Sequence, residues 1–374
     1  MRWRHVLLAL VLFCVLVGSS LIDRQPVAAD SRPTGSARVA TLPKLAVPPR
    51  GCQYHGVYPG GRTGNEDDIR LSDVTSYEAA AGAPVAWVFF SNNWYRSRAF
   101  PAAQATWIRD HGAVPYIRLM LRHNTNELTR SDGPDRSFPL SAIIAGRFDA
   151  DLRRWADAAR DYGGPLLVEY GTEMNGFWLS WNATHNGHDR GAVKFRAAYR
   201  HIVELMRRRG ADNISWVFHV NNDDQPARPW NRMEQYYPGD HYIDWLAVSV
   251  YGSLLPTEHW NESFRAGLAR AYRRLAAMAP TKPIAVAEFG VTKGNPRVDP
   301  TGWARRAFTT LASGDFPRIR GFSWWNERWS NDAVAAHDSD LRIQDVSGMS
   351  DVFSAALARP GVVTAPSTVP FTCR

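Results

Sequence analysis

The segment LLVEYGTEMNGFW, residues 166–178, contains the pattern that repeats along this chain. Its first five residues form an apolar run with the length of a buried strand, and a glycine followed by polar residues ends it. Downstream, residues 193–206 carry apolar side chains at helical spacing, and Gly210 ends that pattern. A second apolar run follows at 214–220. Strand, helix and strand in succession predict a βαβ unit with parallel strands.

The same alternation extends to both sides of this unit. Eight strand-like runs separated by helical patterns predict an α/β protein with a single (β/α)₈ TIM barrel, a fold of ~250 residues or more. A doubly wound sheet is the alternative, but no glycine-rich phosphate loop opens any of the units. The predicted strands are residues 54–58, 85–90, 114–120, 166–170, 214–220, 245–251, 284–289 and 321–325.

The N-terminal residues have the composition of an export signal. Two arginines precede an apolar run at residues 6–18, and Val-Ala-Ala at 27–29 offers a cleavage site. The alternative is an uncleaved anchor, although the run is short of the ~20 residues that a spanning helix needs. We therefore predict a signal peptide at 1–29 and a secreted protein, or an envelope-anchored one if the signal is retained.

The remaining residues divide into three parts. Residues 30–50 are rich in proline and are predicted to be a linker. The barrel is predicted over residues 51–360, and residues 361–374 form a C-terminal tail. Removing the signal leaves two cysteines, Cys52 and Cys373, at the two ends of the folded part. Export permits a disulfide between them, and two unpaired thiols are the alternative.

The chain is basic, with a net charge of +8. Such a charge can attract anionic partners, so association with an anionic cell envelope is one expectation. However, the basic residues are scattered and no nucleic-acid-binding signature is present. We therefore expect a monomer without a nucleic-acid partner.

Two glutamates follow apolar runs at the strand ends where a barrel builds its active site. Glu173 comes just after the fourth predicted strand, and Glu288 lies near the end of the seventh. A pair of carboxyl groups ~5–5.5 Å apart across a groove suits retaining cleavage of a glycosidic bond, because one protonates the leaving oxygen while the other attacks the anomeric carbon. The alternative is that the glutamates only hold hydrogen bonds in the barrel mouth.

Residues 171–178, GTEMNGFW, resemble the acid/base segment of glycoside hydrolase family 26, which includes β-mannanases, lichenases and β-1,3-xylanases. Residues 237–245 and 249–252 are also similar to that family, as are the shorter motifs AEFG and WWN. The resemblance covers roughly residues 52–358 and implies a (β/α)₈ fold, retention of configuration and no cofactor.

The same resemblance implies roles for single residues. Glu173 would be the acid/base and Glu288 the nucleophile, with Tyr251 beside the nucleophile and Trp324 as the platform under the sugar being cleaved. We also expect substrate-binding positions at Arg118, Asn175, Trp178, Trp181, His219 and Asn326. His185, His188 and Asp189 lie in one loop, but three such residues without a partner cluster do not predict a metal site.

Two residues depart from the family pattern. The family usually has histidine directly before the acid/base, where this chain has Thr172, and often arginine four positions before it, where this chain has Glu169. Because Glu169 shares its parity with Glu173, we expect its side chain to point inward and to need a cationic partner. Arg118, near the end of the third strand, is the predicted partner.

Together these features predict a secreted retaining endo-β-glycosidase, with a β-1,4-mannan as the expected substrate. One alternative is a lichenase or β-1,3-glucanase that acts on exopolysaccharide. The other is a carbohydrate-binding barrel without catalysis, which the changes at Thr172 and Glu169 keep open.

Overall fold

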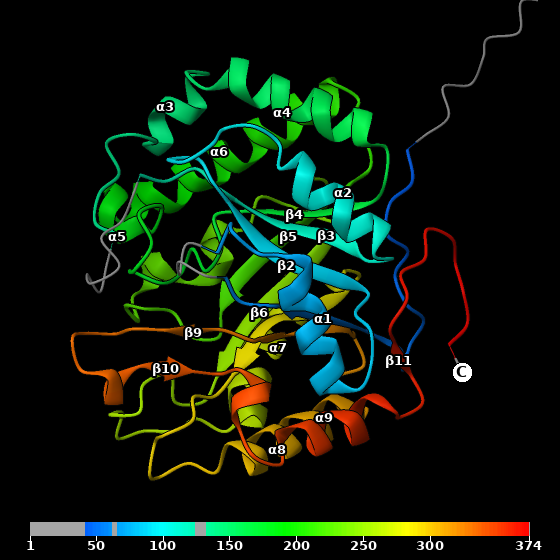
Figure 1. Cartoon of the computed structure of the whole chain (residues 1–374). Coiled ribbons are helices and arrows are strands. Elements are labelled where there is room, and N and C mark those ends of the chain that lie inside the picture. The colour runs from blue at the N-terminus through cyan, green and yellow to red at the C-terminus, as the bar shows by residue number, and fades with distance from the viewer. Residues whose placement is uncertain (1–41, 62–65, 124–131, 374) are drawn as a thin grey trace, which may run out of the picture. The chain divides into compact units, whose positions relative to one another are not determined.

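The computed structural model describes residues 42–61, 66–123 and 132–373. The predicted signal peptide lies outside these residues, as does most of the predicted linker. Eight parallel strands follow one another in chain order around a sheet, and pairing of β1 with β8 closes it into a barrel (Figure 1). The (β/α)₈ prediction is confirmed, because a doubly wound sheet stays open. The barrel strands are β1 (Gln53–Tyr58), β2 (Trp87–Asn93), β3 (Val114–Met120), β4 (Leu166–Tyr170), β5 (Ile214–Asn221), β6 (Trp245–Tyr251), β7 (Ile284–Gly290) and β8 (Ile319–Trp325).

Helices cover the outside of the barrel (Figure 1). The connection from β5 to β6 differs from the others, because only two short 3₁₀ helices lie in it, η1 (Pro229–Asn231) and η2 (Met233–Tyr236). None of the helices within the described residues is long and apolar enough to cross a membrane. The α-helices are α1 (Leu71–Ala81), α2 (Ala102–Asp110), α3 (Leu140–Ile144), α4 (Asp149–Tyr162), α5 (Ala183–Asn186), α6 (Asp189–Arg208), α7 (Phe264–Met278), α8 (Pro300–Ala312) and α9 (Met349–Leu357).

A large indole fills part of the barrel interior. The Trp87 side chain on β2 is fully buried, and its Nε1 donates a hydrogen bond to Ser323 Oγ on β8 at 2.5 Å. Gly56 and Gly321 make room for this ring, since a Cβ at either position would lie 2.0 Å from its atoms. Glycine at these two strand positions therefore follows from close packing inside the barrel.

Both ends of the described chain pack at the start of β1, at the end of the barrel opposite the strand C-termini. Within the predicted linker, Leu45 is buried and Lys44 Nζ lies 3.0 Å from Asp244 Oδ2. Within the predicted tail, β11 (Val362–Val363) pairs in parallel with β1. Residues 42–50 and 361–373 are thus part of the folded domain, because they supply buried and hydrogen-bonded groups to it. The remaining short elements are β9 (Arg328–Trp329), β10 (Ser339–Asp340), η3 (Ala335–His337) and η4 (Ile343–Asp345).

The predicted disulfide between Cys52 and Cys373 is present, with the two Cα atoms 6.2 Å apart. It closes a loop of 321 residues, so it removes many conformations from the unfolded chain. We expect the double variant Cys52→Ser/Cys373→Ser to lose roughly 2–5 kcal/mol of unfolding free energy, measured by urea unfolding. Dithiothreitol serves as the control, since it should weaken the wild type and leave the variant unchanged. Equal unfolding midpoints for the wild type and the variant would show that the bridge contributes nothing.

Candidate active site

Glu288 is held inside the barrel mouth by its strand and by a tyrosine. A β-bulge in the pairing of β6 with β7 brings Glu288 opposite Ser249, a local irregularity of the kind found beside active sites. The Glu288 side chain is buried, and Tyr251 at the end of β6 donates a hydrogen bond from its hydroxyl to Glu288 Oε2 at 2.9 Å. The carboxyl therefore keeps a fixed direction at the C-terminal end of the strands.

Glu173 lies on the loop after β4 and is only partly buried. Its Oε2 accepts a hydrogen bond from Trp178 Nε1 at 2.9 Å. A groove of about 770 Å³ opens beside it, and Tyr251 lies in the wall of the same groove. The groove is lined by Glu173, Trp178, Asn221, Asn222, Asp223, Gln225, Tyr251, Leu254, Trp260, Asn261 and Glu262.

The surroundings of Glu288 favour its protonated form in the free protein. Burial raises the pKa of Glu288 to about 7, against the opposing charges of Arg118 and His219. The charge of Glu173 adds to the increase, so the two carboxyl groups lie within electrostatic reach of each other. A partly exposed carboxyl beside a groove and a buried carboxyl within its electrostatic reach can divide acid and nucleophile roles between them.

Arg118 on β3 lies among the carboxyl groups of the mouth. Its Nη1 lies 2.6 Å from Glu66 Oε2 and 3.9 Å from Glu288 Oε1. Its Nε lies 3.7 Å from Glu169 Oε1, which is the predicted ion pair at a distance too long for a hydrogen bond. Its guanidinium carbon also lies 5.5 Å from the ring centre of Trp325. The predicted pairing of Arg118 with Glu169 exists, but the closest partner of Arg118 is Glu66.

Glu169 takes its hydrogen bonds from other neighbours. His219 Nδ1 lies 2.9 Å from Glu169 Oε2, and the Tyr116 hydroxyl donates to the same oxygen at 2.7 Å. His219 also contacts Thr172 Oγ1 at 3.0 Å and Ser249 Oγ at 2.9 Å. Burial opposes both charges, yet the pKa of Glu169 is lowered and the pKa of His219 is raised by their mutual attraction. A buried, charged pair thus lies below the two candidate catalytic glutamates.

Known proteins resemble this chain in sequence and in fold. Residues 143–295 match the model of glycosyl hydrolase family 26. The match covers less than half of the chain and shows a resemblance to that family. Endoglucanase H of Acetivibrio thermocellus is 30% identical over 195 residues, which are 51% of this chain and 21% of that protein. The mannan endo-1,4-beta-mannosidase A and B of Caldalkalibacillus mannanilyticus is 27% identical over 177 residues, 46% of this chain and 30% of the relative.

The chain spans about a fifth to a third of the length of the curated relatives it matches. Among solved structures, an endo-beta-1,4-mannanase of Cellulomonas fimi has a TM-score of 0.59 at 20% identity, covering 84% of this chain and 72% of that one. The YdhT protein of Bacillus subtilis has the same TM-score at 18% identity, covering 84% and 88%. These likenesses support the barrel fold.

Family 26 proteins often have an arginine at the position of Glu169 on β4, and they usually have a histidine at the position of Thr172 in the loop after it. This chain has the same two residue types on the neighbouring strands. Arg118 comes from β3 and His219 from β5, and both contact Glu169. Thr172, at the usual histidine position, contacts the His219 ring. The departures at 169 and 172 thus leave a cation and an imidazole below the glutamates.

The prediction that Trp324 forms the platform under the sugar is wrong, because its neighbour Trp325 is the tryptophan that faces the barrel interior. Trp324 is 0% exposed, and it packs against Trp303 of α8 and Phe353 of α9 outside the barrel. Side chains alternate along a strand, so the next residue, Trp325, points inward and stacks on Tyr58 with ring centres 3.9 Å apart. Trp325 therefore occupies the position at the barrel mouth.

Several other expected sugar contacts are used inside the protein. Asn175, Trp181, His219 and Asn326 are buried, and their side chains bond to neighbouring protein groups. Trp181, for example, donates from its indole to Thr172 O at 2.8 Å. Of the expected substrate-binding residues, Trp178 and Tyr251 line the groove. Within the described residues, no group of three or more histidine, cysteine, aspartate or glutamate side chains could hold a metal ion.

Two glutamates that the sequence did not single out, Glu66 and Glu327, lie near Arg118. Glu66 has a left-handed backbone with φ 62° and accepts a hydrogen bond from Ser91 Oγ at 2.6 Å. Glu327 accepts from Tyr58 and Trp325, and burial, with the charge of Glu66, raises its pKa to about 8. The position of Glu327, two residues after the last strand, was the one feature of the sequence that could have identified it.

Proposed function

We propose that this chain is a retaining endo-β-glycosidase that cleaves internal linkages of a polysaccharide. The observation that carries the proposal is a groove lined by Glu173 and by Tyr251, where Tyr251 donates to the buried Glu288 and Trp178 donates to Glu173. Most families of glycoside hydrolases cleave the glycosidic bond with such a pair of carboxyl groups.

The reaction proceeds in two steps. Glu288 attacks the anomeric carbon while Glu173 gives its proton to the departing sugar oxygen. Glu173, now ionised, takes a proton from water, and that water releases the sugar from Glu288 with net retention of configuration. Tyr251 holds the oxygen of Glu288 that does not attack, and Trp178 holds the Glu173 carboxyl toward the groove.

β-1,4-Mannan is the proposed substrate, and a β-glucan is the second candidate. A mannan endo-1,4-beta-mannosidase and an Endoglucanase H are both among the similar proteins, so the relatives support either backbone. A reducing-sugar assay on mannan, lichenan, curdlan and xylan tests the choice. New reducing ends on mannan support the first candidate, and new ends on lichenan or curdlan support the second. Binding without new ends on any of them would favour a carbohydrate-binding barrel.

We expect the activity to fall on the acid side of neutrality. Glu288 attacks only when ionised, and burial raises its pKa to about 7. Below that pH the nucleophile is protonated, so kcat/KM should decrease about tenfold per pH unit. Because Arg118 lowers this pKa, Arg118→Met should move the acid limb to higher pH. Measurement of kcat/KM from pH 4 to 9 checks this, and a plateau extending down to pH 5 in the wild type would contradict it.

We further propose that the protein is exported and acts as a monomer outside the cytoplasm. The Cys52–Cys373 disulfide supports export, because disulfides persist in oxidising compartments. The net charge of +8 supports association with an anionic envelope. Fractionation of the producing cells, with the assay above applied to medium and envelope, tests this assignment.

A further inference from the structure

The backbone at Glu173 is in a conformation that non-glycine residues rarely adopt. Its φ is 45°, in the left-handed region. Such a conformation persists at functional sites only where the surroundings hold it. The Glu173 N–H donates to His219 O at 2.9 Å, and Glu173 O accepts from Gly176 N at 2.7 Å. The direction of the candidate acid/base therefore depends on the contacts of residues 173–176.

The buried side chain of Asn175 makes four of these contacts. Its Oδ1 accepts from Asn221 N at 2.9 Å. Its Nδ2 faces three acceptors, Asn221 O at 3.0 Å, Asp223 O at 3.1 Å and Asp224 Oδ1 at 3.1 Å. The Asn175 backbone carbonyl accepts from Gln225 N at 2.8 Å. The loop after β4 is thereby fastened to the loop after β5.

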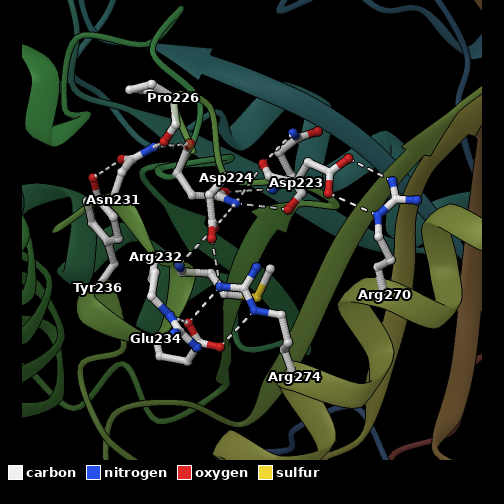
Figure 2. A network of polar contacts seen from close by, with 12 residues as sticks. Asp223, Asp224, Pro226, Asn231, Arg232, Glu234, Tyr236, Arg270 and Arg274 are labelled. Carbon is white, nitrogen blue, oxygen red and sulfur yellow. Dashed lines mark hydrogen bonds and ion pairs between the residues drawn. The ribbon is translucent and has the colours of Figure 1, made fainter. Parts of the chain in front are cut away.

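The contacts of Asn175 with residues 221–225 are called the Asn175 clamp. Asp224 connects this clamp to a helix. Its Oδ1 accepts from Asn175 and from Met233 N at 3.0 Å, while its Oδ2 accepts from Arg274 Nη2 at 2.8 Å. Arg274 also donates to both oxygens of Glu234, at 2.8 and 2.7 Å. Figure 2 shows the Arg274 guanidinium between the carboxyl groups of Asp224 and Glu234. Arg274 lies on α7, the helix that leads into β7 and Glu288.

The ion pair of Arg274 with Glu234 stays charged over the pH range in which an enzyme of this kind works. Burial opposes the charge of Glu234, but the hydrogen bonds from Arg274 lower its pKa to about 2. The hydrogen bonds with Glu234 and Asp224 raise the pKa of Arg274 further above its ordinary value.

We propose that Arg274 is a positioning residue for the acid/base Glu173. Acting through Asp224 and Asn175, it fixes the loop after β4 relative to α7, and so fixes the Glu173 carboxyl relative to the scissile oxygen. The proposal rests on the function proposed above. The role of Arg274 concerns proton donation by Glu173 alone. Loss of Arg274 should therefore impair only those reactions that need a proton on the leaving group.

Arg270 provides a matched control on the same helix, one turn before Arg274. It donates to both oxygens of Asp223, at 3.0 and 2.7 Å (Figure 2). Its guanidinium also lies 2.6 Å from Glu262 Oε1. It thus also binds two carboxylates, but not that of Asp224. Asn175 contacts Asp223 through the backbone carbonyl, which does not depend on the side-chain ion pair with Arg270. Arg270→Met removes ion pairs of the same kind and leaves the contacts of Asp224 in place.

The test compares two aryl β-glycosides that carry the sugar of whichever glycan the wild type cleaves. A phenyl leaving group needs protonation by Glu173, whereas a 2,4-dinitrophenyl group departs without it. We expect Arg274→Met to lower kcat/KM by roughly 10- to 100-fold on the phenyl glycoside, as a misplaced catalytic group does, and by less than about threefold on the dinitrophenyl glycoside. Arg270→Met should leave the ratio of the two kcat/KM values at the wild-type value.

Asp224→Asn repeats the test with a smaller change, should Arg274→Met fail to fold. It keeps an acceptor for Asn175 and removes the charge that Arg274 contacts, so it should change the ratio in the same direction. Equal losses on both glycosides, or no loss on either, would overturn the role of Arg274. If the wild type hydrolyses neither glycoside and no glycan, the proposed function itself fails, and this role fails with it.

Discussion

Replacing Glu288 by alanine is expected to lower kcat on the polysaccharide by roughly 10⁴-fold or more, because the first step then lacks its nucleophile. Folding should be kept, since the replacement removes a carboxyl whose burial is already unfavourable for its charged form. The measurement is the initial rate of reducing-end formation, with thermal unfolding recorded on the same preparation. A variant that folds and keeps more than a tenth of the wild-type rate would contradict the assignment.

A suitable control replaces a glutamate outside the barrel mouth. Glu78 on α1 accepts a hydrogen bond from Val85 N at 3.0 Å and contacts His111. Glu78→Ala should therefore reduce stability and leave kcat unchanged. The contrast between the two variants separates loss of a reacting group from loss of structure.

Glu173→Ala should be impaired in a manner that depends on the substrate. On the polysaccharide we expect a loss of roughly 10²- to 10⁴-fold, the usual contribution of a general acid/base. On a dinitrophenyl glycoside kcat/KM should be nearly unchanged, because that leaving group departs without a proton. Glycosyl-enzyme turnover still lacks its base, so added azide should restore the rate by attacking the anomeric carbon and giving a glycosyl azide. Equal loss on both substrates with no effect of azide would assign Glu173 another role.

Much of the fold could be predicted from the sequence, because parallel strands buried on both faces appear as separate apolar runs. Eight such runs, with helical patterns between them, predicted the closed barrel. Glu173 and Glu288 were identifiable because a charged residue at the end of an apolar strand costs free energy to bury, which indicates a functional role. The resemblance added the contact between Tyr251 and Glu288, which the structure shows at 2.9 Å.

The choice between Trp324 and Trp325 was not accessible to the same reasoning. The two residues are adjacent, so a shift of one residue exchanges the inward and the outward side chain. The pairing of β7 with β8 contains register shifts, so the direction of a β8 side chain does not follow from the pattern of β7. Only the packing of Trp324 on α8 and α9 settles which indole faces the barrel mouth.

Loop residues were the other source of error. Asn175 and Asn326 follow strand ends and were expected to bind sugar, but buried backbone groups need partners and these amides supply them. Glu66 and Glu327 lie near each other only because the first barrel strand, β1, pairs with the last, β8. No local sequence pattern predicts a contact between residues so far apart in the chain.

The most direct test of the proposed mechanism is to trap its covalent intermediate. The wild type would be incubated with a 2-deoxy-2-fluoro β-glycoside of the accepted sugar carrying a dinitrophenyl leaving group, and the labelled peptide would be located by mass spectrometry. We predict one fluoroglycosyl group per chain, attached to Glu288. A label on any other residue, or release of the α-anomer as first product from the natural glycan, would contradict retaining catalysis through Glu288.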